Sequence, residues 1–231
     1  MRFLLTNDDG WGTAGLLTLE KVAAQFGETV TVAPAAPQSG ISHQLTFERP
    51  LNLNQRAANS YELDGTPADC VRIAMTQLGV FDWVLSGINH GANLGADVYV
   101  SGTVAAAREA WLQGISAIAF SQFRSGGIDQ SFDWQLAEAL TRKIFPMLVD
   151  SSSPSGRSLV NVNFPDVSAL SKNVDDVSLQ WCELDPNPLP TQFLSTDEGY
   201  VYSGIYRERA REAGCDIDLC FTGDVAITKL H

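Results

Sequence analysis

The sequence predicts an α/β fold with a Rossmann-like, mostly parallel sheet flanked by helices, and three observations near its start support this prediction. Residues 2–6 form a short run, rich in apolar side chains, that ends in polar turn residues, as a buried strand does. Apolar residues then recur at helical spacing over 13–26, and a β-branched run over 28–34 ends in proline. A strand, a helix and a second strand in this order form a βαβ unit with parallel strands.

The same alternation continues along the chain. Residues 44–63 alternate in places and are expected to form antiparallel ribbon strands at the edge of the sheet. Thr66 and Pro67 predict the start of a helix that runs to about residue 78. Further strands are expected over 81–86, 115–121 and 159–165, and further helices after Ser101 and over 131–149.

The pattern changes in the last third of the sequence. Residues 151–156, which are mostly serine with proline and glycine, are typical of a linker, and prolines with short polar-apolar alternations after residue 165 indicate hairpins and extended arms. We therefore expect an α/β catalytic core over 1–165. A C-terminal hairpin and arm region over 166–231 is expected to belong to the same domain.

The composition narrows the possible partners. With 231 residues, of which 45% are hydrophobic, the chain is long enough to form one large soluble domain. Its formal net charge of −12 argues against binding to DNA, RNA or anionic lipid, which require a basic surface. The four cysteines show neither zinc-site nor disulfide-framework spacing. Because no run reaches membrane length and the first apolar run is too short for a signal peptide, a cytoplasmic protein is expected.

Two adjacent carboxylates, Asp8 and Asp9, follow the first predicted strand. Ligands of parallel sheets bind beyond the carboxyl ends of the strands, and two like charges at such a position are costly unless a cation neutralises them. A hard divalent metal with oxygen ligands is the simplest such cation. Ser39 and Gly40, after the second strand, can add an oxygen ligand or backbone donors. The alternative is that the two aspartates only cap a helix or fill a turn.

A glycine-rich loop is predicted over 87–97, directly after the strand at 81–86. Its glycines allow a ligand to approach the backbone, and its asparagines offer amide oxygens and donors. Ser101, Gly102 and Thr103 then introduce an alanine-rich helix, whose free N–H groups and two hydroxyls suit an anion.

Taken together, five short motifs in one order make the first 165 residues resemble the SurE family of metal-dependent nucleotidases, also described as acid phosphatases. The motifs are Asn7-Asp8-Asp9-Gly10, Ser39-Gly40, Gly65-Thr66-Pro67-Ala68-Asp69-Cys70-Val71, Ser86-Gly87-Ile88-Asn89 with Gly91, Asn93, Gly95 and Asp97, and Ser101-Gly102-Thr103-Val104. The resemblance implies a Rossmann-like sheet, one divalent metal ion per subunit (Mg²⁺ or Mn²⁺), and hydrolysis of nucleoside 5′- and 3′-monophosphates. It also implies dimers or tetramers that exchange carboxyl-terminal segments.

The resemblance also assigns site residues. Metal ligands fall on Asp8, Asp9, Ser39 and Asn89, with the two aspartates as the catalytic residues. Phosphate contacts fall on Asn7, Asn93, Ser101, Gly102 and Thr103. The sequence departs from the family pattern at Ala35, where an acidic residue is usual, and at Gln38, where an arginine or similar residue is usual. It also lacks the usual helix after residues 223–230, which bears on the oligomer and on substrate preference.

The expected chemistry is direct hydrolysis of a phosphomonoester, in which Asp8 or Asp9 either assists a water molecule or attacks phosphorus itself. The rival from another class is a metal- or nucleotide-binding module without turnover. A response-regulator receiver is disfavoured because the third strand ends in Ser86 and Gly87 instead of aspartate, and a haloacid-dehalogenase-type phosphatase would need Asp-x-Asp. Outside the motifs, His90 is a candidate substrate contact, while His43 and Arg108 are expected to be structural or surface residues.

Overall fold

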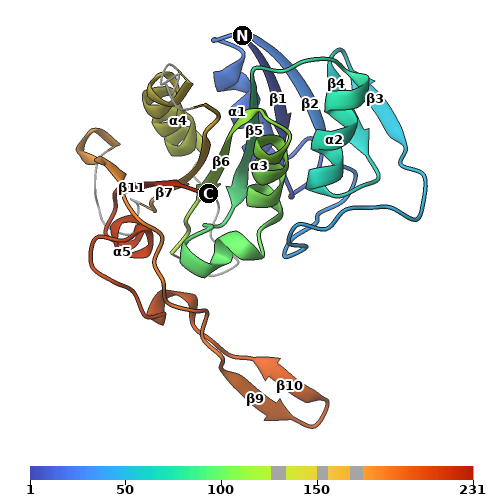
Figure 1. The fold of residues 1–231 in the computed structure, drawn as a ribbon. Coiled ribbons are helices and arrows are strands. Elements are labelled where there is room, and N and C mark those ends of the chain that lie inside the picture. The colour runs from blue at the N-terminus through green and yellow to red at the C-terminus, as the bar shows by residue number, and fades with distance from the viewer. Residues whose placement is uncertain (126–133, 150–155, 167–173, 231) are drawn as a thin grey trace.

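The computed structural model describes residues 1–125, 134–149, 156–166 and 174–230. The predicted linker over 151–156 lies almost wholly outside the described residues, as do the first three residues of the helix predicted over 131–149. Within the described part, one sheet of nine strands forms the centre of the molecule, with helices on both faces (Figure 1). The predicted α/β class with a mostly parallel sheet is confirmed.

The order of strands across the sheet places β1 between β2, whose following loop contains Ser39, and β5, which contains Asn89. The strands lie in the order β3 (Leu53–Ala57), β4 (Ser60–Leu63), β2 (Glu28–Pro34), β1 (Arg2–Thr6), β5 (Trp83–His90), β6 (Ser116–Gln122), β7 (Leu159–Phe164), β11 (Val225–Lys229) and β8 (Leu179–Trp181). In this spatial order the six strands β4, β2, β1, β5, β6 and β7 are mutually parallel. Strand β3 pairs antiparallel with β4, and β11 pairs antiparallel with β7. The carboxyl ends of β2, β1 and β5 therefore meet at one edge of the sheet.

Alternate side chains of β1 point into two separate cores. Phe3 and Leu5 pack in one core with residues of α1 (Ala14–Ala23) and α4 (Trp134–Val149). Leu4 packs in the other core with residues of α2 (Pro67–Gln77) and α3 (Gly102–Leu112). This alternation follows from the period of two in a strand, and it makes a three-layer arrangement of helix, sheet and helix. Because both faces of β1 are buried, its carboxyl end has a fixed position.

The start of α2 agrees with the sequence in detail. The Thr66 hydroxyl accepts a hydrogen bond from the backbone N–H of Asp69 at 3.1 Å, and the Asp69 carboxylate accepts from the backbone N–H of Thr66 at 3.0 Å. This is the capping box expected from a threonine followed three residues later by an acidic side chain, with Pro67 in the first turn. Both residues are buried, so the entry to α2 is rigid.

The predicted loop over 87–97 is wrong in its first part. Strand β5 continues to His90, past a register shift between Ser86 and Asn89 against β6. Gly87 permits this irregular pairing, since it has a φ of +132° and a Cβ there would lie 2.2 Å from the Phe120 carbonyl oxygen. The remainder of the segment includes a short 3₁₀ helix, Gly95–Tyr99.

The carboxyl-terminal residues contribute both to the sheet and to a separate hairpin. Strands β8 and β11 join the central sheet. The 3₁₀ helix Val174–Asp176 precedes β8, and the 3₁₀ helix Tyr206–Glu208 and α5 (Asp216–Phe221) precede β11. Strands β9 (Phe193–Thr196) and β10 (Gly199–Tyr202) pair only with each other, in a hairpin that projects away from the body (Figure 1). The helices of the described segments are all too short or too polar to cross a membrane.

Candidate active site

Asp8 lies just beyond the end of β1 and is almost completely buried, with 4% of its surface exposed. The hydroxyl of Thr103, at the start of α3, donates a short hydrogen bond to Asp8 Oδ1. Gly102 makes this approach possible, because a Cβ at that position would lie 2.8 Å from the Asp8 Cβ and 3.0 Å from Oδ2. The amino end of α3 is thus packed directly against the first predicted ligand.

The buried position changes the ionisation of Asp8. Desolvation raises the pKa of the carboxyl group from 3.8 to about 6; the hydrogen bond from Thr103 opposes this rise, and the charge of Asp9 adds to it. A buried carboxylate beside a second carboxylate is poorly stabilised by itself and gains strongly from a bound cation. The ionisation of Asp8 therefore fits a metal ligand better than a turn residue.

Asp9 is held by the last residue of β5. Its Oδ2 accepts a hydrogen bond from the backbone N–H of His90 at 3.2 Å, and its Oδ1 lies 3.2 Å from His90 Nδ1. The His90 ring also packs on Trp134 of α4, with ring centroids 5.0 Å apart. The preceding residue of β5 is Asn89. Its amide nitrogen donates to the Gly91 carbonyl at 2.8 Å, so that the amide oxygen is the side-chain atom left for a cation.

A backbone contact ties the loop that follows β2 to Asp8. The N–H of Gln38 donates to the Asp8 carbonyl at 2.7 Å, and the next residue, Ser39, is exposed. Three adjacent strands, β2, β1 and β5, thus deliver Ser39, the two aspartates and Asn89 to one edge of the sheet. Among the described residues, this edge included, no group of three or more His, Cys, Asp or Glu side chains is arranged to hold a metal, so the predicted set depends on the two aspartates together with a hydroxyl and an amide. The predicted donors are all oxygens, which suits Mg²⁺ or Mn²⁺.

The start of α3 leaves backbone donors facing this edge. Ser101 is the N-cap, and its hydroxyl accepts from the N–H of Val104 at 3.1 Å. Gly102 and Thr103 occupy the first two helical positions, where N–H groups have no partner within a helix. The N–H of Thr103 helps to lower the pKa of Asp8. The hydroxyl of Thr103 is engaged with Asp8, and the predicted phosphate contact of Thr103 stays a prediction.

This geometry can be set beside known proteins. The family model described as survival protein SurE matches residues 3–187. The chain belongs to the SurE family. A protein of Nostoc sp. (strain PCC 7120) is 42% identical over the full length of both chains, and the 5′-nucleotidase SurE of Neisseria meningitidis (strain FAM18) is 35% identical over all of this chain and 92% of its own. The crystal structure of the SurE protein from Aquifex aeolicus superposes with a TM-score of 0.84 at 30% identity, covering 100% of this chain and 93% of that one.

Asn7, a predicted phosphate contact of this SurE chain, shapes the turn that carries the aspartates. Its amide nitrogen donates to the Gly10 carbonyl at 3.0 Å and to the Thr13 hydroxyl at 2.8 Å, and its amide oxygen accepts from the Gly10 N–H at 3.2 Å. The Thr13 hydroxyl is engaged in this turn instead of capping α1. The side chain holds the loop, and its contact with phosphate stays a prediction.

Asn93 lies in a buried network of amides beyond β5. Its backbone N–H donates to Asn163 Oδ1 at 2.8 Å, and its carbonyl accepts from the side chains of Asn161 and Asn163 at 2.9 and 3.0 Å. Its own amide nitrogen donates to the Ser121 hydroxyl at 2.7 Å. These bonds fasten the loop after β5 to β6 and β7. The predicted phosphate contact of Asn93 likewise stays a prediction.

A buried carboxylate of α3 forms ion pairs that the sequence pattern does not predict. Glu109 of α3, the residue after Arg108, is only 3% exposed. Its carboxylate lies 2.9 Å from His43 Nε2 and 3.4 Å from Arg72 Nη1, and the hydrogen bond with His43 lowers its pKa. An alanine-rich helix has no marked polar face, so the pattern alone does not show which side is buried. The pair links the loop after β2 to α3.

Proposed function

We propose that this protein is a divalent-metal-dependent phosphomonoester hydrolase that converts nucleoside 5′-monophosphates, and also 3′-monophosphates, to nucleoside and phosphate. The observation that carries the proposal is the contact between the buried Asp8 and the first turn of α3, which puts a candidate metal ligand beside the N–H group of Gly102 and the positive end of the helix. Membership of the SurE family and the printed names of relatives as 5′-nucleotidases support the choice of substrate.

The proposed metal is Mg²⁺ or Mn²⁺, held by Asp8, Asp9, Ser39 and Asn89. The buried carboxylate with the raised pKa and the all-oxygen donor set fit such an ion. When bound, it would polarise the phosphoryl group and lower the pKa of a bound water.

The chain's own groups have separate roles in this proposal. Thr103 holds the Asp8 carboxylate in one orientation, and the backbone of His90 does the same for Asp9. The N–H group of Gly102 and the positive end of the α3 dipole stabilise negative charge on the phosphoryl oxygens. Hydroxyl and amide groups therefore position the carboxylates, and the helix start binds the phosphate.

The oxygen that attacks phosphorus comes either from water or from one of the aspartates. The two routes differ in whether a covalent aspartyl-phosphate forms. Acid quench of the enzyme during turnover of a nucleotide labelled with ³²P in its phosphate tests this: label retained on Asp8 or Asp9 rules out the simple water route.

The first test is phosphate release from a panel of nucleoside monophosphates with Mn²⁺, Mg²⁺ or EDTA. The wild type is compared with Asp8→Asn and with Asp175→Asn, a matched change at an exposed aspartate of the 3₁₀ helix Val174–Asp176. Metal-dependent release that Asp8→Asn abolishes and Asp175→Asn retains supports the proposal. Metal-dependent binding of nucleotide with no release by the folded wild type would support the alternative, a binding module without turnover.

We further propose that the protein forms homodimers or homotetramers through the β9–β10 hairpin. An isolated two-stranded hairpin is marginally stable in water, and this one exposes large apolar side chains on an arm away from the body (Figure 1). The exposed apolar residues are Phe193, Leu194, Tyr200, Val201 and Tyr202. Contact with a second copy of the chain would cover them.

A further inference from the structure

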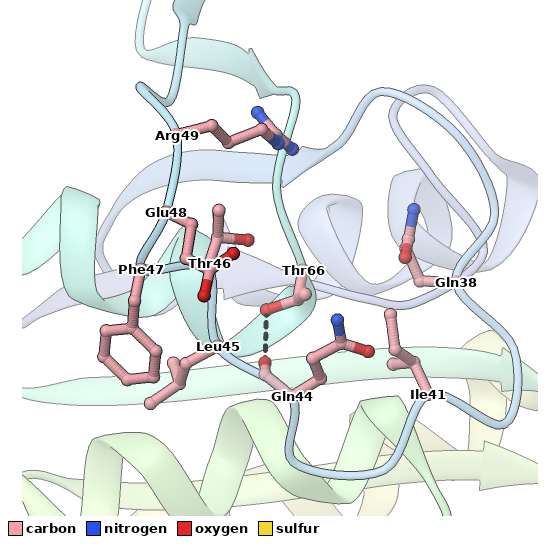
Figure 2. Close-up of a pocket in the computed structure, with 9 residues that line it drawn as sticks. All are labelled: Gln38, Ile41, Gln44, Leu45, Thr46, Phe47, Glu48, Arg49 and Thr66. Carbon is pink, nitrogen blue, oxygen red and sulfur yellow. Dashed lines mark hydrogen bonds between the residues drawn. The ribbon is translucent and has the colours of Figure 1, made fainter.

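A pocket of about 610 Å³ lies beside the candidate active site, in the segment between β2 and α2. Its lining combines amides, hydroxyls, a carboxylate and apolar side chains: Gln38, Ile41, Gln44, Leu45, Thr46, Phe47, Glu48, Arg49 and Thr66 (Figure 2). Pockets of this volume hold small organic ligands. Of the predicted site residues, this pocket contains none, so it is a separate feature of the chain.

Gln38 connects the pocket to the candidate active site. Gln38 lines the pocket, and the backbone N–H of the same residue donates to the Asp8 carbonyl at 2.7 Å. Ser39, a predicted metal ligand, is the next residue. A molecule whose phosphate lies at Asp8 and the start of α3 can therefore extend its other end into the pocket.

One wall of the pocket is rigid because Asp69 holds it. The Asp69 carboxylate accepts from the backbone N–H of Thr46 at 3.1 Å and from that of Thr66 at 3.0 Å, and the Thr66 hydroxyl donates to the Gln44 carbonyl at 2.7 Å. Figure 2 shows this last bond, with Thr46, Glu48 and Thr66 on one side of the hollow and Gln38 on the other. A wall fixed before binding lowers the entropy cost of holding a ligand.

Phe47 is the feature of the pocket that points to a ring-shaped ligand. Its side chain is 80% exposed, although burial is the usual fate of a phenylalanine ring. Among the described residues it has no aromatic partner, and it stands at the edge of the pocket beside Leu45 (Figure 2). An exposed aromatic face next to polar groups is the arrangement that proteins use to stack a nucleobase and contact its polar edge.

The charges of the pocket disfavour a second phosphate. Arg49 is already committed, since it donates to the Pro50 carbonyl at 3.0 Å and to the Asp64 carbonyl, and it lies 3.3 Å from Asp64 Oδ1. Glu48 adds a negative charge that repels anions and accepts hydrogen bonds from N–H groups. The pocket therefore suits the uncharged, N–H-bearing end of a ligand.

From these observations we propose that the pocket binds the nucleoside part of the substrate, with the base against Phe47 and its N–H edge toward Glu48. The inference rests on the proposed nucleotidase function and adds the place where the base is recognised. Gln38 and Gln44 supply further amide contacts to the base or to the ribose.

The test compares Phe47→Ala with Val80→Ala, which truncates another strongly exposed apolar side chain, in the turn before β5. The ratio of kcat/KM for AMP to kcat/KM for glycerol 2-phosphate, which has no ring, is expected to fall about tenfold in Phe47→Ala because stacking is lost. Val80→Ala is expected to keep the wild-type ratio. A wild-type ratio in folded Phe47→Ala would overturn the inference.

Binding of phosphate-free nucleoside separates this inference from the proposed function. Isothermal titration of metal-free protein with adenosine is expected to show weak binding by the wild type and by Asp8→Asn, and about tenfold weaker binding by Phe47→Ala. If the wild type releases no phosphate from either ester yet binds adenosine through Phe47, the hydrolase proposal fails and the pocket stands. If the wild type hydrolyses AMP but the wild type and Phe47→Ala have equal adenosine affinity, the pocket inference fails alone.

Discussion

Thr103 donates a hydrogen bond to the buried carboxylate of Asp8, although 95 residues separate them in the chain. The contact joins the end of β1 to the start of α3, so one bond couples the candidate metal ligand to the candidate phosphate site. The bond also lowers the pKa of Asp8, against the larger effect of burial. Hydrogen bonds of this kind, from a second layer of residues, orient metal ligands and tune their affinity.

Replacing Thr103 by valine keeps the shape of the side chain and removes this donor. We expect Mn²⁺ affinity to fall about 10- to 100-fold, because Asp8 loses orientation and its pKa rises further. Isothermal titration with Mn²⁺ measures the change, and Thr103→Ser, which retains a hydroxyl, is the control. Equal affinities of the valine variant and the wild type would show that the hydrogen bond has no part in metal binding.

Gly102→Ala should damage the site by steric means alone. A Cβ at this position would lie 2.8 Å from the Asp8 Cβ, a distance that real Cβ contacts essentially never show, so either Asp8 or α3 must move. We expect at least a tenfold loss of kcat, since displacements of about 1 Å in a catalytic site have effects of this size. Circular dichroism melting checks that the variant is folded. Full activity in a folded variant would contradict the close packing of α3 on Asp8.

Asp8→Asn should stabilise the metal-free protein at neutral pH. The pKa of Asp8 is about 6 in the folded protein and 3.8 ordinarily. The folded state therefore becomes more stable, by taking up a proton, as the pH falls through 6, and this stabilisation is absent above pH 6. The difference corresponds to a penalty of about 3 kcal/mol above pH 6, which asparagine, still able to accept from Thr103, avoids. Urea denaturation in EDTA should show the variant more stable near pH 7.5, with the advantage largely lost near pH 4. Equal unfolding free energies near neutral pH would refute the penalty.

The sequence predicts the central fold well because β1, α1 and β2 have patterns that depend on local burial. In each of these elements the apolar residues indicate one kind of secondary structure. The rule that ligands bind beyond the carboxyl ends of parallel strands then predicts that Asp8 and Ser39 lie at the same edge of the sheet. The proximity of Asn89 depends on β5, whose last residues were predicted as loop. Gly87 makes this part of the strand look like a loop in the sequence. A glycine is needed there because the Phe120 carbonyl approaches it closely, and a local sequence pattern does not show such a contact.

Long-range pairing explains the other differences. Glu109 is buried because His43 and Arg72, from separate elements, converge on it. Strand β11 enters the sheet antiparallel to β7, more than 60 residues earlier in the chain, so the polar-apolar alternation near the end of the sequence was open to interpretation as an arm. Propensity is local, whereas both of these features depend on partners that are distant in the sequence.

The hairpin gives a prediction about assembly that leaves the sheet intact. Leu194 and Val201 face each other across β9 and β10, so the double change Leu194→Glu and Val201→Lys removes two exposed apolar side chains and supplies a cross-strand charge pair. Removing everything after Gly199 would be a poor test, because it would also remove β11. If the hairpin joins subunits, light scattering should show a multiple of 25.0 kDa for the wild type and about one chain mass for the double variant. Leu17→Glu, at an exposed apolar residue of α1, is the control and should keep the wild-type mass. An unchanged multimer in the double variant would place the subunit contact elsewhere, and a monomeric wild type would end the proposal.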